Sequence, residues 1–193
     1  MRDASSTFPG VDRFPPRDKA SLNASQQALF ADIESRRGKM PAPYEALAGS
    51  PEVATLFERL SSRLWKGVLP VHVLEVVFLI TARHHRCIYQ WQTHRSKALE
   101  AGVEPGVIRA IGSDSGLEGI SMRHKEVADV YRFLRALYGR HAVSDQDFER
   151  LATHFDEAGL SELLAFSGLA TSVAMLLNVR QIMPAPSADD TFS

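Results

Sequence analysis

The stretch Val71–His94 has the sequence VHVLEVVFLITARHHRCIYQWQTH, and its interpretation decides the fold. Its first half is rich in valine, which is compatible with a buried strand as well as with a buried helix. The length of this half, the helical patterns that flank it and the preceding Pro70 favour a helix. The residues from Cys87 onward predict a second helix, which ends at Gly102. The sequence therefore predicts two consecutive helices at the centre of the chain.

Apolar residues recur at helical spacing on both sides of this pair. Upstream, Leu29 and Ile33 share one face of a helix that begins at Ser21 or Asn23 and ends at Gly38. No alternation of strands and helices with glycine-rich loops appears, which disfavours a nucleotide-binding α/β fold. The fold class that we predict is all-α. Further helices are expected at 43–50, 51–67, 104–113, 124–141, 144–159 and 160–182, with a glycine-containing loop at 112–123.

The chain is expected to form one domain, at residues 21–183. Its 193 residues are 45% hydrophobic and 23% charged, which suits a single core of ordinary size. Residues 1–20 hold several prolines and predict an extended arm, and residues 184–193 predict a tail. The segment 160–182 is apolar on nearly all sides, so it lies either at the centre of the core or between subunits. We therefore expect a homo-oligomer.

Charge and cysteine content restrict the partners and the compartment. Lys and Arg total 22 and Asp and Glu total 23, so no basic excess indicates nucleic acid or an anionic membrane as a partner. A single cysteine cannot form an internal disulfide, which fits the reducing cytoplasm. The N-terminus lacks the apolar region of a signal peptide. Ser, Thr and Asn interrupt the apolar run 163–179, so we expect a buried helix and no membrane span there.

The central pair of helices also holds the candidate site. Glu75 lies within an apolar helix, where a carboxylate needs a partner, and His94 on the next helix is the obvious one. Such pairing is expected to raise the pKa of His94 unless burial outweighs it, and an acid role would make activity fall at alkaline pH. Cys87, Gln90, Trp91 and His94 stand at i, i+3, i+4 and i+7, along one helical face.

The chain is similar to the carboxymuconolactone decarboxylase family, which includes the alkylhydroperoxidase D-like proteins. The resemblance covers roughly Leu29–Leu177, and its most specific part is Glu75 together with the run from Trp91 and His94 to Gly102. It is also carried by the segments RGKMPAPYEALAGSPEVATLFERL (37–60), YQWQTHRSKALEAGVEPGVIRAI (89–111) and ELLAFSGLATSVAMLLNV (162–179). The resemblance implies an all-α, alkylhydroperoxidase D-like fold assembled as a trimer or a hexamer.

The chain departs from the peroxidase members of that family at one position. Those members carry Cys-x-x-Cys, with a Glu upstream and a His downstream as a proton relay. Here the first cysteine matches Cys87, but the second position is Gln90, and Tyr89 stands where those members often have a His. A dithiol peroxidase needs its second thiol to resolve the sulfenic acid that forms on the first. The order Tyr, Gln, Trp, His instead resembles the decarboxylase-like branch.

The leading hypothesis is therefore a lyase-like enzyme of aromatic compound degradation. It would decarboxylate or isomerise a small carboxylated lactone, with His94 as the acid and Glu75 holding its tautomer. The residues expected to bind substrate are Arg86, with Arg83 or Arg95 as other carboxylate partners, and Tyr89, Gln90 and Trp91. The alternatives are a peroxidase-related protein that uses Cys87 alone, and a non-catalytic family member. No cofactor is expected, and no metal, because His72 and Glu75 at i, i+3 are only a weak chelating pair.

Overall fold

The computed structural model describes residues 17–182 and 184, and these residues form helices and connecting loops without a strand. The predicted all-α fold class is thus confirmed. A 3₁₀ helix, η1 (Lys19–Ser21), precedes the α-helices. In chain order the α-helices are α1 (Ala24–Arg37), α2 (Ala42–Ala46), α3 (Pro51–Leu64), α4 (Val71–His85), α5 (Ile88–Glu100), α6 (Pro105–Ser113), α7 (Glu126–Arg140), α8 (Asp145–Ala152) and α9 (Glu157–Arg180).

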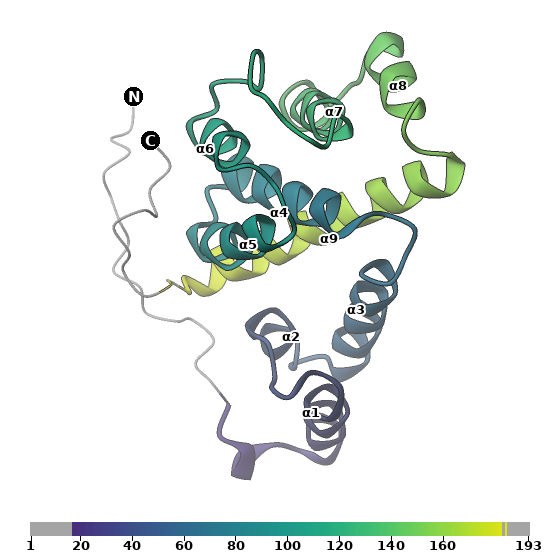
Figure 1. The fold of residues 1–193 in the computed structure, drawn as a ribbon. Coiled ribbons are helices and arrows are strands. Elements are labelled where there is room, and N and C mark those ends of the chain that lie inside the picture. The colour runs from purple at the N-terminus through teal and green to yellow at the C-terminus, as the bar shows by residue number, and fades with distance from the viewer. Residues whose placement is uncertain (1–16, 183, 185–193) are drawn as a thin grey trace.

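Helix α4 is the centre of the fold. Every residue from Val73 to Ala82 is buried, because α5, α6, α7 and α9 surround the helix (Figure 1). A helix that is covered on all sides needs apolar side chains all round, and this explains why its sequence resembles a buried strand. Pro70 stands directly before the first turn, where its missing N–H costs nothing. Burial on all sides makes Glu75 the exception on this helix.

Helix α9 runs along α4 and closes the other side of the core (Figure 1). The side chain of Asp156 caps it by accepting a hydrogen bond from the N–H of Gly159, at 2.9 Å. It is long and apolar enough to cross a membrane by length and composition alone, and 39% of its most apolar window is buried. Leu163, Phe166 and Ala170 face the core, as in the central helix of a globular domain.

Helices α1, α2 and α3 form a second, smaller layer with its own apolar cluster, which includes Phe30, Ile33 and Tyr44 (Figure 1). The side chain of Asn23 accepts a hydrogen bond from the N–H of Gln26, and the Gln26 side chain bonds back, so α1 begins with the predicted cap. Gly38 ends α1 with φ of 74°, a conformation that favours glycine. This layer covers the side of α4 and α9 on which Glu75 lies.

The structure corrects one predicted helix and leaves the ends of the chain untested. The segment 144–159 is two elements, because α8 ends at Ala152 and Asp156 already caps α9. The acidic residues that suggested one helix lie in the first turns of two helices. There their carboxylates accept hydrogen bonds from free backbone N–H groups. Of the predicted arm, residues 1–16 lie outside the described residues, as do residue 183 and residues 185–193 of the predicted tail.

Candidate acid–base site

A tight reversal between α4 and α5 creates the site. Arg86 adopts a left-handed conformation with φ of 52°, and the N–H of Cys87 donates to the carbonyl of Ala82 at 2.9 Å. The chain therefore turns back at once, and α5 packs beside α4. This arrangement brings Glu75 on α4 to the level of His94 on α5, nineteen residues later in the sequence.

Glu75 and His94 form a buried pair. Nδ1 of His94 lies 2.7 Å from Oε2 of Glu75, and the two residues are 8% and 2% exposed respectively. A carboxylate only accepts hydrogen bonds, so Nδ1 carries the ring proton and donates a hydrogen bond to Glu75. That tautomer leaves Nε2 as the nitrogen with a free lone pair. The predicted pairing across the two helices is thus present in the structure.

Aromatic rings hold the imidazole of His94 in place. The ring of Phe78 stacks on it with 3.8 Å between centroids and 5° between planes. Trp65 lies parallel to both rings, with its centroid 6.4 Å from that of His94. Phe166 meets Trp65 and Phe78 edge to face. The ring of His94 therefore has a fixed plane, set by aromatic neighbours and by the bond to Glu75.

Burial lowers the pKa of His94 below its ordinary value of 6.5. Removal of the charged form from water is the largest effect, and the hydrogen bond and charge of Glu75 oppose it without overcoming it. The nearby positive charge of Lys97 lowers the pKa further. The sequence left the direction open, because pairing raises the pKa of His94 and burial lowers it, and in the structure burial outweighs pairing. A neutral imidazole is a base, which changes the role that His94 can take.

The pair opens onto a cavity of about 630 Å³ between the small layer and the main core. One wall is aromatic, with Trp65 and Phe78, and another is apolar, with Val173 and Leu177 of α9. Two exposed lysines, Lys39 and Lys97, contribute to the lining. The other lining residues are Arg37, Met40, Pro41, Ala42, Pro43, Tyr44, Glu45, Ser61, Glu75, Tyr89, Gln90, Thr93 and His94.

Gln90 presents an incompletely bonded amide in this cavity. Its Nε2 donates to the carbonyl of Phe78 at 3.2 Å, and its buried Oε1 accepts no hydrogen bond from the protein. A buried acceptor without a donor costs about 1–3 kcal/mol, so a bound molecule with an O–H or N–H group gains by supplying one. Gln90 and Tyr89 both line the cavity, as their predicted substrate-binding role requires.

Two other predicted substrate-binding residues lie elsewhere. Trp91 is buried in the main core, where its ring packs so closely against Gly112 that an added Cβ would lie 3.1 Å away. Arg86 is exposed at the turn between α4 and α5 and does not line the cavity. One face of α5 packs on α4 and α6, and the adjacent face borders the cavity. Helical spacing alone does not tell on which of these two faces Trp91 lies.

Cys87 is buried behind the site. It is 1% exposed, packs with Ala174 and Leu177 of α9, and is absent from the cavity lining. Burial raises the pKa of its thiol to about 11, and a hydrogen bond from the N–H of Gln90 only partly opposes this. Reactive cysteines instead have a lowered pKa and some exposure. The position therefore favours packing over nucleophilic chemistry.

Several lining residues were missed by sequence reasoning. Trp65 follows α3, and Tyr44 lies on α2. The hydroxyl of Tyr44 donates a hydrogen bond to Ser61 at 2.9 Å. Arg37, at the end of α1, donates to buried Glu58 and lies over the ring of Tyr44. All of them come from the small layer or its connection to α4. No local pattern in these segments signals that they fold over the Glu75–His94 pair.

Comparisons with known proteins identify the fold. No family model matches the sequence, and no curated protein matches it. An uncharacterized peroxidase-related protein from Silicibacter sp. TM1040 superimposes with a TM-score of 0.70 over 99% of this chain and all of the other, at 14% identity. A second peroxidase-related protein, described as an alkylhydroperoxidase AhpD core, from Ralstonia eutropha JMP134, gives 0.67 at 18% identity and covers 86% of this chain and 88% of its own.

The chain has the alkylhydroperoxidase D-like fold. A third structure with this fold is the debrominase Bmp8, crystallised as a C82A variant with 2,3,4-tribromopyrrole. It has a TM-score of 0.65 and 14% identity, and covers 87% of this chain and 89% of its own. Identities this low show the fold alone, and structures with this fold carry different activities. The activity of this chain must therefore be argued from its own site.

Proposed function

We propose that the protein is an enzyme that moves a proton within a small cyclic organic acid, with His94 as the base. The observation that carries this proposal is the buried bond of 2.7 Å between Nδ1 of His94 and Oε2 of Glu75 beside a cavity. A carboxylate behind an imidazole fixes the tautomer and stabilises the cation that forms when the ring takes up a proton.

The proposed reaction needs no external proton. Nε2 of neutral His94 takes a proton from a carbon that lies between a carbonyl group and a carbon–carbon double bond, and the electron pair of the C–H bond is delocalised over both as a dienolate. Glu75 holds the Nδ1 proton while the ring is cationic. The imidazolium then returns the proton to the far carbon of the original double bond, the carbonyl group reforms with the carbon–carbon double bond now next to it, and His94 is neutral again.

Isomerisation fits this site better than decarboxylation. Loss of carbon dioxide leaves a carbanion that takes a proton from the enzyme, so His94 would have to be protonated before each turnover. The lowered pKa of His94 opposes protonation of the ring at neutral pH. In an isomerisation the substrate itself supplies the proton. Both reactions were predicted from the sequence, and the electrostatics of the site favour the isomerisation.

The cavity supports a flat, anionic substrate. Lys39 and Lys97 are exposed cations in its lining, which attract a carboxylate. Trp65 and Phe78 contribute aromatic side chains to the lining, and a flat ring packs well against aromatic groups. Gln90 lines the cavity, and we propose that its Oε1, which has no donor from the protein, accepts from a substrate O–H or N–H. The structure of Bmp8 contains a flat heteroaromatic ring, and this supports the same class of ligand here.

A peroxidase-like reaction at Cys87 is the weaker alternative. It needs a thiolate that meets the oxidant, whereas burial raises the pKa of this thiol to about 11 and Cys87 does not line the large cavity. Gln90 also stands in the position of a second thiol. We therefore propose that Cys87 packs and does not react.

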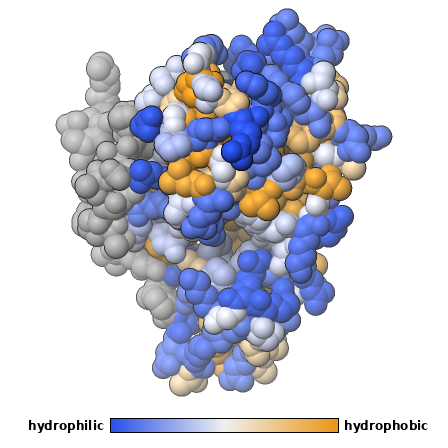
Figure 2. Space-filling model, in the orientation of Figure 1, coloured by the Kyte–Doolittle hydropathy of each residue, from blue (hydrophilic) through white to orange (hydrophobic). Residues whose placement is uncertain are grey.

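The assembly and location that we propose are those expected from the sequence. A homo-oligomer would cover apolar side chains that one chain leaves exposed, including Leu56, Leu60, Met175 and Val179. Figure 2 shows apolar residues at the surface between hydrophilic ones on one face of the molecule. An acid–base enzyme with one buried cysteine and balanced charge suits the cytoplasm.

Proton exchange in D₂O tests the proposed function without knowledge of the true substrate. Muconolactone, its carboxylated derivative and related unsaturated lactone acids are incubated with the protein and followed by proton NMR. We expect wild-type protein to exchange a carbon-bound proton for deuterium in at least one compound, and the His94→Gln variant to lose that exchange. Equal exchange by both proteins would refute the role of His94. Exchange that needs Cys87 instead would favour the alternative.

A further inference from the structure

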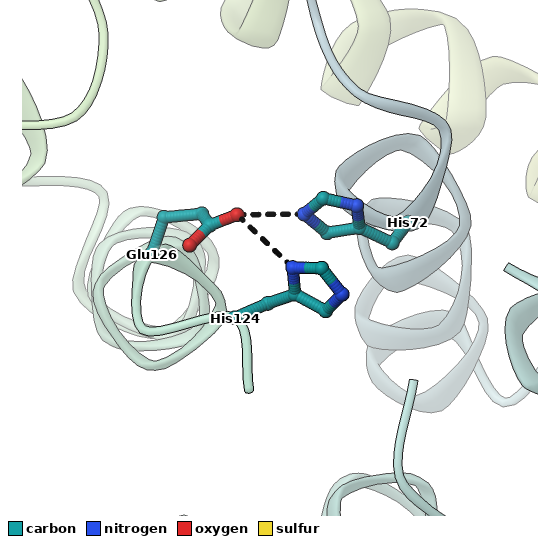
Figure 3. A group of neighbouring side chains, drawn as sticks. All are labelled: His72, His124 and Glu126. Atoms are coloured by element: carbon teal, nitrogen blue, oxygen red, sulfur yellow. Dashed lines mark hydrogen bonds and ion pairs between the residues drawn. The ribbon is translucent and has the colours of Figure 1, made fainter. Parts of the chain in front are cut away.

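Three potential metal ligands meet at the N-terminal end of α4. His72 lies in the first turn of α4, Glu126 is the first residue of α7, and His124 ends the loop before α7 (Figure 3). Nε2 of His72 lies 2.6 Å from Oε1 of Glu126, and Nδ1 of His124 lies 3.7 Å from the same oxygen. The donor atoms of all three lie within 4.8 Å of one another.

The two imidazoles are oriented together. Their rings stack with 3.7 Å between centroids and 23° between planes, so both present a nitrogen toward the Glu126 carboxylate (Figure 3). All three side chains are half-buried, with 13%, 23% and 22% of the side chain exposed for His72, His124 and Glu126. They are accessible to an ion from solvent, and they are packed well enough to hold a position. This is the one such group of three among the residues that the structure describes.

We propose that His72, His124 and Glu126 bind a divalent transition-metal ion of the Zn²⁺ type. Two imidazole nitrogens and one carboxylate oxygen are the donors that Zn²⁺ and its neighbours in the first transition row prefer. Three protein ligands leave the fourth tetrahedral position to a water molecule. His72, His124 and Glu126 belong to a different cluster from Glu75 and His94, and none of them lines the large cavity.

Binding requires at least one of the stacked imidazole rings to turn, because each nitrogen lone pair lies in its ring plane and the two planes are only 23° from parallel. Ligands about 2.0–2.1 Å from a tetrahedral zinc ion stand about 3.3 Å from each other. The observed separations of 2.6 and 3.7 Å lie on either side of that value. The metal takes the place of the proton on Nε2 of His72, and the bound ring is a neutral imidazole with its one proton on Nδ1.

The ion would tie a loop to the core. Residues 114–125 connect α6 to α7 without regular helix, and His124 is near the end of that segment. Ligation fastens it to the N-terminus of α4, which is the central helix of the domain. Since the ion binds only the folded arrangement, it stabilises the fold by mass action.

Zinc titration of tag-free, chelator-treated protein tests the site. Isothermal titration calorimetry is expected to show one Zn²⁺ per chain. His72→Ala and His124→Ala should each weaken binding more than about a hundredfold, since even outer-shell partners of a metal contribute about ten- to a hundredfold. Glu126→Gln should weaken it in the same direction. Zn²⁺ at about a hundred times Kd should raise Tm by about 5–10 °C.

Matched controls separate this site from other histidines. His154 also contacts a carboxylate, with Nε2 2.9 Å from Oδ2 of Asp129, but has no second imidazole beside it. His154→Ala and the double variant His84→Ala/His85→Ala should bind Zn²⁺ as the wild type does. X-ray absorption at the zinc edge should show two imidazole ligands. Absence of binding at a Zn²⁺ concentration of 100 µM (roughly the weak end for a useful site), or loss of binding only in the controls, would overturn the proposal.

Circular dichroism keeps the variants interpretable. The three ligands are half-buried at the surface, so alanine there should leave the helical spectrum and the unfolded fraction unchanged. If one variant fails to fold, the other two still decide the outcome, because the loss of any single ligand weakens the same site.

Discussion

Nδ1 of His94 donates a hydrogen bond of 2.7 Å to Oε2 of Glu75, although the two residues lie on different helices and nineteen positions apart. Both are almost fully buried, and Phe78 stacks on the imidazole at 3.8 Å. A carboxylate in an apolar helix is costly unless something pairs with it. The bond therefore stabilises Glu75 in the core and also orients Nε2 of His94 as a base. One contact serves the fold and the proposed chemistry.

His94→Gln should abolish most of the activity and keep the fold. Glutamine retains polar atoms near Glu75 but cannot take up a proton, so the rate should fall about a hundredfold or more. Glu75→Gln should lose less, because Glu75 orients His94 without receiving the substrate proton. Deuterium exchange rates on one substrate measure both, and Thr93→Ser is the control for a lining residue outside the relay. A wild-type rate in His94→Gln would contradict the assignment.

Activity should fall as the pH is lowered. The pKa of His94 lies below 6.5 in the folded protein because burial favours the neutral ring, and the neutral ring is the active base. Rates should be constant above pH 6.5 and decline as the pH falls through the folded pKa. The stability contribution has the same sign, since it is present above the unfolded pKa and is lost at lower pH. A decline on the alkaline side alone would mean that His94 acts as an acid.

Cys87→Ser should change neither activity nor fold by much. The thiol is buried with a pKa near 11, and Cys87 is the N-cap of α5, where serine is a favoured residue. The cap offsets the cost of burying a hydroxyl, so the free energy of unfolding should change by no more than about 1–2 kcal/mol. Iodoacetamide should label the native protein slowly and the unfolded protein fast. Rapid labelling of native protein, or peroxide turnover that the serine variant lacks, would restore the redox alternative.

The chain should sediment as a homo-oligomer, with a trimer or a hexamer expected. Val53, Leu56 and Leu60 form an exposed apolar stripe on α3, and Met175 and Val179 extend from α9. Leu56→Lys should weaken assembly, because a charge would be buried in the interface. Glu149→Gln on α8 adds the same charge away from the stripe and should assemble normally. A stable wild-type monomer at micromolar concentration would refute the expectation.

The helices were predictable because their signals are local. The burial of α4 on all sides shows in its continuous apolar run, and the caps at Asn23 and Ser144 show in the residues that precede α1 and α8. The Glu75–His94 pair was also predictable, since a carboxylate in such a run needs a partner and few histidines are near. Trp91, which was expected on the same helical face as His94, lies in the core and does not line the cavity. Helical spacing defines a face but not the neighbour that covers it.

The remaining parts of the site depend on contacts between distant segments. Trp65, Tyr44 and Lys39 reach the cavity because the small layer folds over α4 and α5. His72 meets Glu126, fifty-four positions away, rather than Glu75 in its own helix. The pKa of His94 required the actual burial of the ring, since pairing and desolvation act in opposite directions. The sign could not be decided from residue types alone.

Nuclear magnetic resonance titration of His94 tests the central claim most directly. Protein labelled with ¹⁵N is titrated from pH 8 to about pH 5, and the His94 signals are assigned by their loss in His94→Gln. The account predicts a pKa below 6.5, with the proton of the neutral ring on Nδ1 and none on Nε2. Glu75→Gln should shift these signals, and His154→Ala should not. A pKa above 6.5, or a neutral ring protonated on Nε2, would contradict the account.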